Sequence, residues 1–128
     1  MLKTTQTLRF NYEFSRIYKR GKFSTGRHLA VHAFKRGPNL KHNLTRIPQD
    51  LLRVGFTNSH GRKTVVARNR AKRLLRAAFA KYEPDVLLGY DIIFLMKSGE
   101  ILPTYQEVEK EMGRHLSNLG LLKSGELL

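Results

Sequence analysis

Two stretches of the chain carry apolar residues at the spacing of one helix face. The first, 8–20, predicts a short helix with Asn11 as its N-cap and Gly21 as a left-handed C-cap. The second, 68–82, predicts a longer helix that ends before Pro84, because the residue ahead of a proline avoids helical geometry. The two apolar stripes consist of Phe10, Phe14, Ile17 and Tyr18, and of Ala71, Leu74, Leu75, Ala78, Phe79 and Tyr82.

A third helix is predicted near the C-terminal end. Thr104 and Glu107 form the T-x-x-E pattern of a capping box, directly after Pro103. Gly120 follows the helix as its terminator. The apolar stripe of this helix consists of Tyr105, Val108, Met112, Leu116 and Leu119.

Strands are predicted where the apolar pattern changes period. Residues 28–34 and 51–57 alternate, 63–66 form a short third strand, and 90–96 are a continuous apolar run typical of a buried strand. Residues 37–51 contain two prolines and predict an elaborated loop. The order α-β-β-β-α-β-α predicts one α/β domain, an α+β sandwich, over residues 1–128. We expect its core to include Phe10, Ile17, Val54, Leu74, Leu75, Ile92 and Ile93.

The charge of the chain is strongly asymmetric. It has 24 Lys and Arg against 10 Asp and Glu, a net charge of +14. Residues 1–82 hold 20 basic and 2 acidic residues, whereas 83–128 hold 4 basic and 8 acidic ones. This distribution predicts one positive face whose partner is a polyanion, with nucleic acid favoured over an anionic membrane. A membrane-binding helix would need an exposed apolar face, which a domain of this size needs for its core.

Composition also narrows the chemistry and the compartment. The chain has no cysteine, which excludes disulfides, thiolate zinc sites and a cysteine nucleophile. No apolar run approaches the roughly 18 residues of a membrane span, and the first residues lack the apolar core of a signal peptide. We therefore expect a cytoplasmic protein with no membrane partner.

The second helix concentrates the basic residues. At about 100° per residue, its cations and one asparagine occupy an arc of roughly 140°, with Arg70 at the border. No acidic residue lies between Asp50 and Glu83 to relieve their repulsion. This helix therefore favours contact with nucleic acid. The residues of the arc are Arg68, Asn69, Lys72, Arg73 and Arg76.

The same segment resembles a known family. Residues 65–76 read Val-Val-Ala-Arg-Asn-Arg-Ala-Lys-Arg-Leu-Leu-Arg, which is similar to the RNR signature of the bacterial ribonuclease P protein component. Residues 8–22, 53–55 and 90–93 resemble the family's first helix and the strands on either side of the signature. The resemblance covers about 8–115. It departs from the family at 58–62, which lack the usual Ser-Lys-Lys-like stretch, and at His32, where many members place an aromatic residue.

The resemblance implies a fold, an activity and partners. The fold would be similar to the second domain of ribosomal protein S5, with a left-handed β-α-β crossover through the basic helix. The protein would bind the catalytic RNA of ribonuclease P as a monomer, one protein to one RNA, and would contact the 5′ leader of precursor tRNA. The holoenzyme removes that leader by hydrolysing one phosphodiester bond, with Mg²⁺ held mainly by the RNA. No small-molecule substrate is expected.

Two groups of site residues follow from the resemblance and from residue chemistry. Aromatic rings stack on unpaired bases while neighbouring cations hold phosphates, so a cleft between the first helix and the sheet is expected to take the leader. The catalytic RNA would contact Arg68, Asn69, Arg70, Lys72, Arg73 and Arg76. The leader cleft would consist of Arg9, Phe14, Arg16, Tyr18, Lys22, His32 and Arg53.

The residues do not predict a catalytic or metal site in the protein itself. A metal-dependent phosphodiesterase needs several carboxylates close together, yet the basic two-thirds offers only Glu13 and Asp50. We interpret Glu83, Asp85 and Asp91 as helix caps and surface charge. The five histidines are scattered at 28, 32, 42, 60 and 115.

Two other functions remain compatible with the composition. One is a non-enzymatic RNA-binding protein, such as a ribosomal or assembly protein. The other is a DNA-binding regulator that uses 68–76 as a recognition helix, although that helix offers few base-reading side chains besides Asn69 and Arg70.

Overall fold

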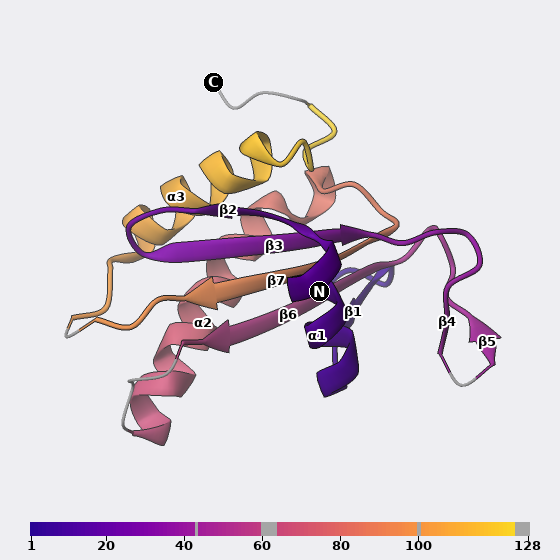
Figure 1. Ribbon diagram of the computed structural model, residues 1–128. Coiled ribbons are helices and arrows are strands. Elements are labelled where there is room, and N and C mark those ends of the chain that lie inside the picture. Colours follow the sequence, from indigo (N-terminus) through magenta and orange to yellow (C-terminus); the bar gives the residue numbers. More distant parts are fainter. Residues whose placement is uncertain (43, 60–63, 100, 125–128) are drawn as a thin grey trace.

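The computed structural model describes residues 1–42, 44–59, 64–99 and 101–124, and it contains one five-stranded sheet flanked by helices (Figure 1). In chain order the elements are β1 (Thr5–Thr7), α1 (Asn11–Arg20), β2 (Lys22–Thr25), β3 (Leu29–Lys35), β4 (Lys41–His42), β5 (Thr45–Arg46), β6 (Leu52–Asn58), α2 (Val65–Tyr82), a 3-10 turn (Glu83–Asp85), β7 (Tyr90–Met96) and α3 (Tyr105–Asn118).

The sheet has the order β1-β6-β7-β3-β2. β1, β6 and β7 are parallel, whereas β3 runs antiparallel to β7 and β2 antiparallel to β3. β6, α2 and β7 form a β-α-β unit between neighbouring parallel strands, and its crossover is left-handed (Figure 1). Such crossovers are right-handed in about 98% of cases. The left-handed crossover that the family resemblance implied is therefore confirmed.

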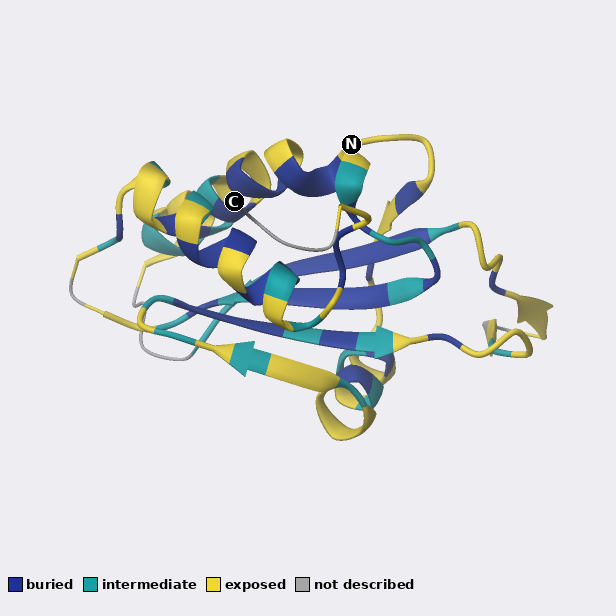
Figure 2. Ribbon diagram, turned by 90° about the horizontal axis from the view of Figure 1, so that it is seen from above, coloured by how far each residue is buried: buried dark blue, intermediate teal, exposed yellow. Residues whose placement is uncertain are grey.

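The helices divide between the two faces of the sheet. α2 and α3 lie behind the sheet in Figure 1, and α1 alone crosses the front. Side chains that alternate along the strands serve both faces, so Ile92 and Phe94 pack in the large core beneath α2 and α3. Ile93 belongs to a small cluster with Leu8 and Ile17 beneath α1. The central strands are buried and the edge strand β2 is largely exposed (Figure 2). One helix therefore leaves part of the front face open.

The predicted helices and the central strands are confirmed, and the differences lie at edges and ends. The predicted strand 63–66 is wrong in its described part, because Val65 and Val66 begin α2. Thr64 caps that helix, its Oγ1 accepting a hydrogen bond from the Ala67 N–H at 3.1 Å. Lys63 lies outside the described residues. Prediction also missed β1, β2 and the β4–β5 hairpin, which stands inside the expected loop 37–51.

The ends of α1 also differ from expectation. Phe10 is the N-cap and Asn11 is already helical. Phe10 is 44% exposed, so its assignment to the core is wrong. Gly21 has φ −80° and ψ 169°, which is extended and not left-handed. A glycine is needed there for another reason, because a Cβ would lie 2.5 Å from the carbonyl oxygen of Ala33.

A buried carboxylate fastens α3 to the sheet. Glu111 is 1% exposed, and its two oxygens accept the N–H groups of His28 at 2.9 Å and Leu29 at 2.6 Å. His115 Nε2 lies 2.9 Å from the same carboxylate, and His115 Nδ1 lies 2.7 Å from Ser24 Oγ. Burial alone would raise the pKa of Glu111, but these hydrogen bonds outweigh it and lower the pKa below its usual value.

We expect Glu111→Gln to lower the free energy of unfolding at pH 7 by about 1–3 kcal/mol, since two backbone N–H groups lose a charged acceptor. A carboxylate with a lowered pKa stabilises the fold above its unfolded pKa, and that contribution disappears as pH falls through the folded pKa. The difference in unfolding free energy between wild type and variant, measured by urea denaturation, should therefore become smaller below about pH 4. Glu109→Gln is the matched control, because it removes a carboxylate from the same helix that contacts Lys81 and Tyr105 near the surface. A gap that stays constant down to pH 3 would contradict the role of the Glu111 charge.

Candidate nucleic-acid interface

The first candidate surface is the cationic face of α2, defined by Arg68, Asn69, Arg70, Lys72, Arg73 and Arg76. Asn69, Arg70, Arg73 and Arg76 are exposed, and Arg68 and Lys72 are half-buried. The opposite side of the helix packs Ala71, Leu75, Ala78 and Phe79 into the large core. The amphipathic division predicted from the sequence is therefore confirmed. Within the described parts of the chain, Arg70, Lys72 and Arg73 have no acidic partner.

Contacts with β6 hold this helix at the end of the sheet. The Asn58 Nδ2 group donates a hydrogen bond to the carbonyl oxygen of Arg68 at 3.1 Å. The Arg76 guanidinium lies over the Phe56 ring, 5.7 Å from its centroid. Contacts at the first and the fourth turn therefore tie the cationic helix to β6. Within 58–62, where the sequence departs from the family, residues 60–62 lie outside the described residues.

The second candidate surface is an aromatic cluster on the open front face, defined by Tyr18, Phe23 and His32. The rings of Tyr18 and His32 pack edge to face, with their centroids 4.8 Å apart. The Phe23 ring stacks on the His32 ring, with their centroids 5.7 Å apart. Tyr18 is 43% and Phe23 64% exposed. Burial lowers the pKa of His32, so at pH 7 its ring is neutral and offers an aromatic surface. Burial also raises the pKa of Tyr18.

Sequence reasoning placed Tyr18 and His32 together but missed Phe23. Phe23 lies on the edge strand β2, directly opposite His32 of β3. The available signal was a short polar–apolar run after Gly21, too brief to predict a strand by itself.

Phe14 sits deeper than Tyr18, between α1 and the sheet. It is half-buried and packs against the small cluster of Leu8, Ile17 and Ile93. Its ring lies directly on the backbone of β6, because a Cβ on Gly55 would come within 2.7 Å of Phe14 Cζ. A glycine in β6 therefore lets α1 approach the sheet, and Phe14 belongs to the packing beneath α1.

The cations predicted for the cleft fall into two groups. Arg9 and Lys22 are exposed, at opposite ends of α1. Arg16 is half-buried, with its guanidinium 5.6 Å from the centre of the Phe34 ring and 3.7 Å from Asp91 Oδ2. Arg53 is buried beneath α1. Its assignment to the leader cleft stays a prediction.

Arg53 belongs to an ion cluster beneath α1, defined by Glu13, Arg16, Arg36, Arg53 and Asp91. Arg53 donates to both oxygens of Asp91, at 2.8 Å from Nε and 2.6 Å from Nη2, and pairs with Glu13 through Nη1. Arg36 Nη1 donates to Asp91 at 2.7 Å. Asp91 is completely buried, so its interpretation as surface charge is wrong. Arg36 is a structural residue that sequence reasoning missed.

The ion cluster keeps its arginines charged in a buried place. Burial opposes the charge of Arg53, but hydrogen bonds and attraction from Asp91 and Glu13 outweigh it and raise the pKa of Arg53. Burial lowers the pKa of Arg36, and Asp91 offsets this only in part. Three arginines face two carboxylates, so both carboxylates are committed to structure.

The remaining candidate groups do not converge. His28 Nε2 lies 3.3 Å from Glu107 Oε2, whereas His32 belongs to the aromatic cluster and contacts Tyr18. Among the described residues, no three His, Asp or Glu side chains gather where they could hold one metal ion. No helix in the described part of the chain is long and apolar enough to cross a membrane.

The fold and these two surfaces define a small α/β protein suited to a polyanionic partner. The chain belongs to the ribonuclease P protein family, since the family model described as Ribonuclease P matches residues 2–120. The ribonuclease P protein component of Alkaliphilus oremlandii (strain OhILAs) is 30% identical over 123 residues, which cover 96% of this chain and 98% of that protein. The component from Pelotomaculum thermopropionicum is 31% identical over 126 residues, covering 98% and 97%.

Solved structures share the fold. The ribonuclease P protein of Staphylococcus aureus matches with a TM-score of 0.70 and 22% identity, covering 91% of this chain and 96% of that one. The protein from Thermotoga maritima matches with a TM-score of 0.62 and 22% identity, covering 92% and 96%. Membership of the family makes this chain the protein component of an endoribonuclease complex that contains RNA and acts in tRNA processing.

We expect Asp91→Asn to lower the free energy of unfolding by about 3–5 kcal/mol, because it leaves buried arginines without their shared countercharge. Asp85→Asn is the matched control and should cost about 1 kcal/mol or less, since the Asp85 carboxylate bonds to the exposed Ser124 at the surface. Urea denaturation at pH 7 measures both. Equal losses for the two variants would mean that the ion cluster contributes no more than a surface pair.

Proposed function

We propose that the two surfaces divide the work of one RNA-binding protein. The cationic face of α2 binds the catalytic RNA of ribonuclease P, and the aromatic cluster beside α1 binds the 5′ leader of precursor tRNA. The observation that supports this most is their placement on opposite faces of one sheet, α2 behind it and α1 in front (Figure 1). A protein arranged in this way can hold two RNA segments at once, one on each face of the sheet.

The cationic face suits a structured RNA backbone. Its side chains are long, positive and regularly spaced along one rigid helix, which favours phosphates over base edges. Each phosphate that is neutralised releases counterions and so strengthens binding.

The aromatic cluster suits an unpaired strand of varied sequence. Tyr18 and Phe23 expose ring surface for stacking, and every base has a π-face. Lys22 lies next to Phe23 in the sequence, and Arg9 lies at the other end of α1, so there are cations on both sides of the rings. Such a site holds a leader by stacking and charge, independent of its sequence.

The protein's role in the reaction is positional. Glu13 and Asp91, the carboxylates nearest the proposed cleft, are paired with arginines and are unsuited to hold a metal ion. In our proposal the RNA holds the Mg²⁺ that supports phosphodiester hydrolysis. The protein lowers phosphate repulsion where leader and catalytic RNA meet, as one monomer per RNA.

The direct test is leader removal at low magnesium. Labelled precursor tRNA is incubated with a bacterial ribonuclease P RNA, with and without this protein, and the 5′ product is followed. We expect cleavage to require both components. If the protein binds RNA but leaves cleavage unchanged, the chain acts as a non-enzymatic RNA-binding protein and our proposal fails.

We expect Tyr18→Ala to weaken binding of precursor tRNA to the protein–RNA complex by about fivefold or more, the effect of losing one stacking ring. Mature tRNA, which lacks the leader, should bind as before. Tyr18→Phe keeps the ring and serves as the control. Equal losses for precursor and mature tRNA would place Tyr18 outside the leader site.

We expect Arg73→Ala to weaken binding of the catalytic RNA and to reduce the slope of log K against log salt by about one, for one lost phosphate contact. Lys110→Ala removes the same charge from an exposed position on α3 and should leave the slope unchanged. Titrations at several salt concentrations measure both slopes. Matching slopes for the two variants would exclude the cationic face of α2 as the RNA-binding surface.

A further inference from the structure

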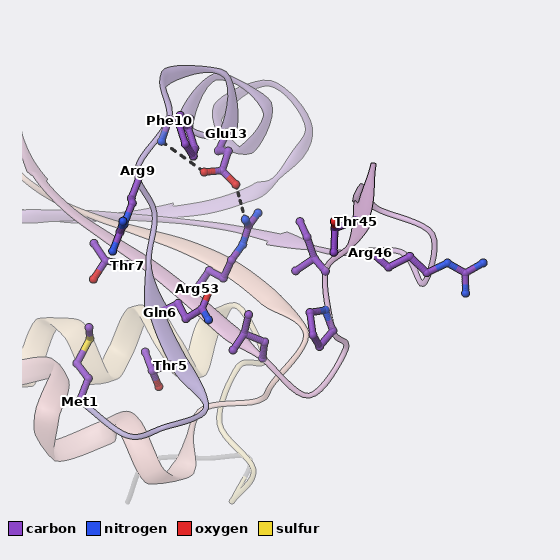
Figure 3. A pocket seen from close by; sticks show the side chains of 13 residues that line it. Met1, Thr5, Gln6, Thr7, Arg9, Phe10, Glu13, Thr45, Arg46 and Arg53 are labelled. Carbon is purple, nitrogen blue, oxygen red and sulfur yellow. Dashed lines mark hydrogen bonds and ion pairs between the residues drawn. The ribbon is translucent and has the colours of Figure 1, made fainter. Parts of the chain in front are cut away.

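A pocket lined by no residue of the cationic face of α2 or of the aromatic cluster opens at the N-terminal end of α1 (Figure 3). Its volume is about 730 Å³, within the range of ligand sites in proteins. β1 forms one wall, the first turn of α1 forms the roof, and the stretch from Thr45 to Leu51 forms the far wall. The hairpin missed by sequence reasoning therefore helps to build this N-terminal pocket.

The charges at its edges are positive. Arg9 and Arg46 are exposed and lie on opposite sides of the pocket, with Arg46 extending outward from the hairpin (Figure 3). Neither has an ion-pair partner among the described residues. The acidic residue at the pocket, Glu13, is neutralised by Arg53. Two available cations on opposite rims suit a chain of phosphates that crosses the opening.

An aromatic surface adjoins these cations. Phe10 lines the pocket and is 44% exposed, and Tyr12 stacks on it with centroids 5.7 Å apart. Two exposed aromatic residues in one turn are costly in water and offer a stacking surface for a base.

The interior of the pocket is polar. Gln6, Thr7 and Thr45 line it beside Thr5. Thr5 is only 7% exposed, and its Oγ1 has no hydrogen-bond partner in the described structure. A buried hydroxyl without a partner is costly unless a ligand or water satisfies it. The pocket thus combines a hydroxyl without a partner, an aromatic surface and two cations. These groups match the polar edge of a base, its flat face and the phosphates of a nucleotide.

We propose that the N-terminal pocket binds one unpaired nucleotide of single-stranded RNA. The base stacks on Phe10 and bonds to the polar interior, while Arg9 and Arg46 hold the flanking phosphates. That the bound strand is the 5′ leader of precursor tRNA rests on the proposed function. The 1.5 Å rise per helical residue puts Phe10 and Tyr18 about 12 Å apart along α1. A leader that passes the aromatic cluster therefore reaches the pocket only if it is a few nucleotides longer.

Leader length provides the first test. Precursor tRNAs with leaders of about four and about twelve nucleotides are titrated against the complex of protein and catalytic RNA. We expect Phe10→Ala to weaken binding of the long leader about fivefold or more and Arg46→Ala to lower its salt slope by about 0.7. The short leader should bind both variants as it binds wild type. Arg46→Lys keeps the charge and Lys110→Ala removes a distant one, so both should match wild type.

The second test uses the protein alone and separates this proposal from the proposed function. Amide NMR shifts are followed while a single-stranded oligoribonucleotide, a mononucleotide or inorganic phosphate is added. We expect the oligoribonucleotide to shift the amides of Thr5, Phe10 and Arg46, with phosphate far weaker.

The outcomes are distinct. If Tyr18→Ala leaves the binding of precursor tRNA unchanged but those three amides shift, the proposed leader function fails and the pocket remains an RNA site. Three unshifted amides at saturating oligoribonucleotide, or an equal response to phosphate, would overturn the pocket proposal. So would equal losses for short and long leaders in Arg46→Ala.

Discussion

The buried carboxylate of Asp91 is the interaction on which the front of the molecule depends. It lies on the central strand β7 and binds Arg53 from β6 and Arg36 from the end of β3, and Arg53 in turn holds Glu13 of α1. Burying these charges is expensive, so the cluster contributes orientation more than net stability. It fixes α1 over the sheet and so sets the place of Tyr18 in the aromatic cluster.

The two faces of the sheet are consequently different surfaces. Behind it, α2 and α3 bury a large apolar core, and only the outer side of α2 is cationic. In front, a single short helix sits close to β6 because Gly55 has no side chain to hold the Phe14 ring away. A left-handed crossover brings α2 to the back of the sheet, on the side away from α1. Two surfaces of opposite orientation therefore come from a domain of 128 residues.

Most of the framework could be predicted from local pattern, and the ion cluster could not. The strand 90–96 and the capping box at Thr104 and Glu107 are confirmed because apolar runs and caps depend on neighbours in sequence. β2 and the β4–β5 hairpin were missed because short polar strands depend on their partners. The pairing of Arg53 with Asp91 could not be predicted, because the two residues lie 38 positions apart in the sequence. The cationic face of α2 was found since its spacing is local, whereas Phe23 needed the strand pairing.

Arg36 has a consequence for how the chain tolerates change in length. Its guanidinium donates to the carbonyl oxygens of Pro48 and Leu51, and the Gln49 side chain bonds back to Gly37 at 3.0 Å. Hydrogen bonds thereby join the two ends of the 37–51 segment to each other, and the β4–β5 hairpin between them stands clear of the sheet. Insertions, deletions or a peptide label would be absorbed at the hairpin without disturbing the domain. A change of length there would reshape the far wall of the N-terminal pocket and leave the sheet as it is.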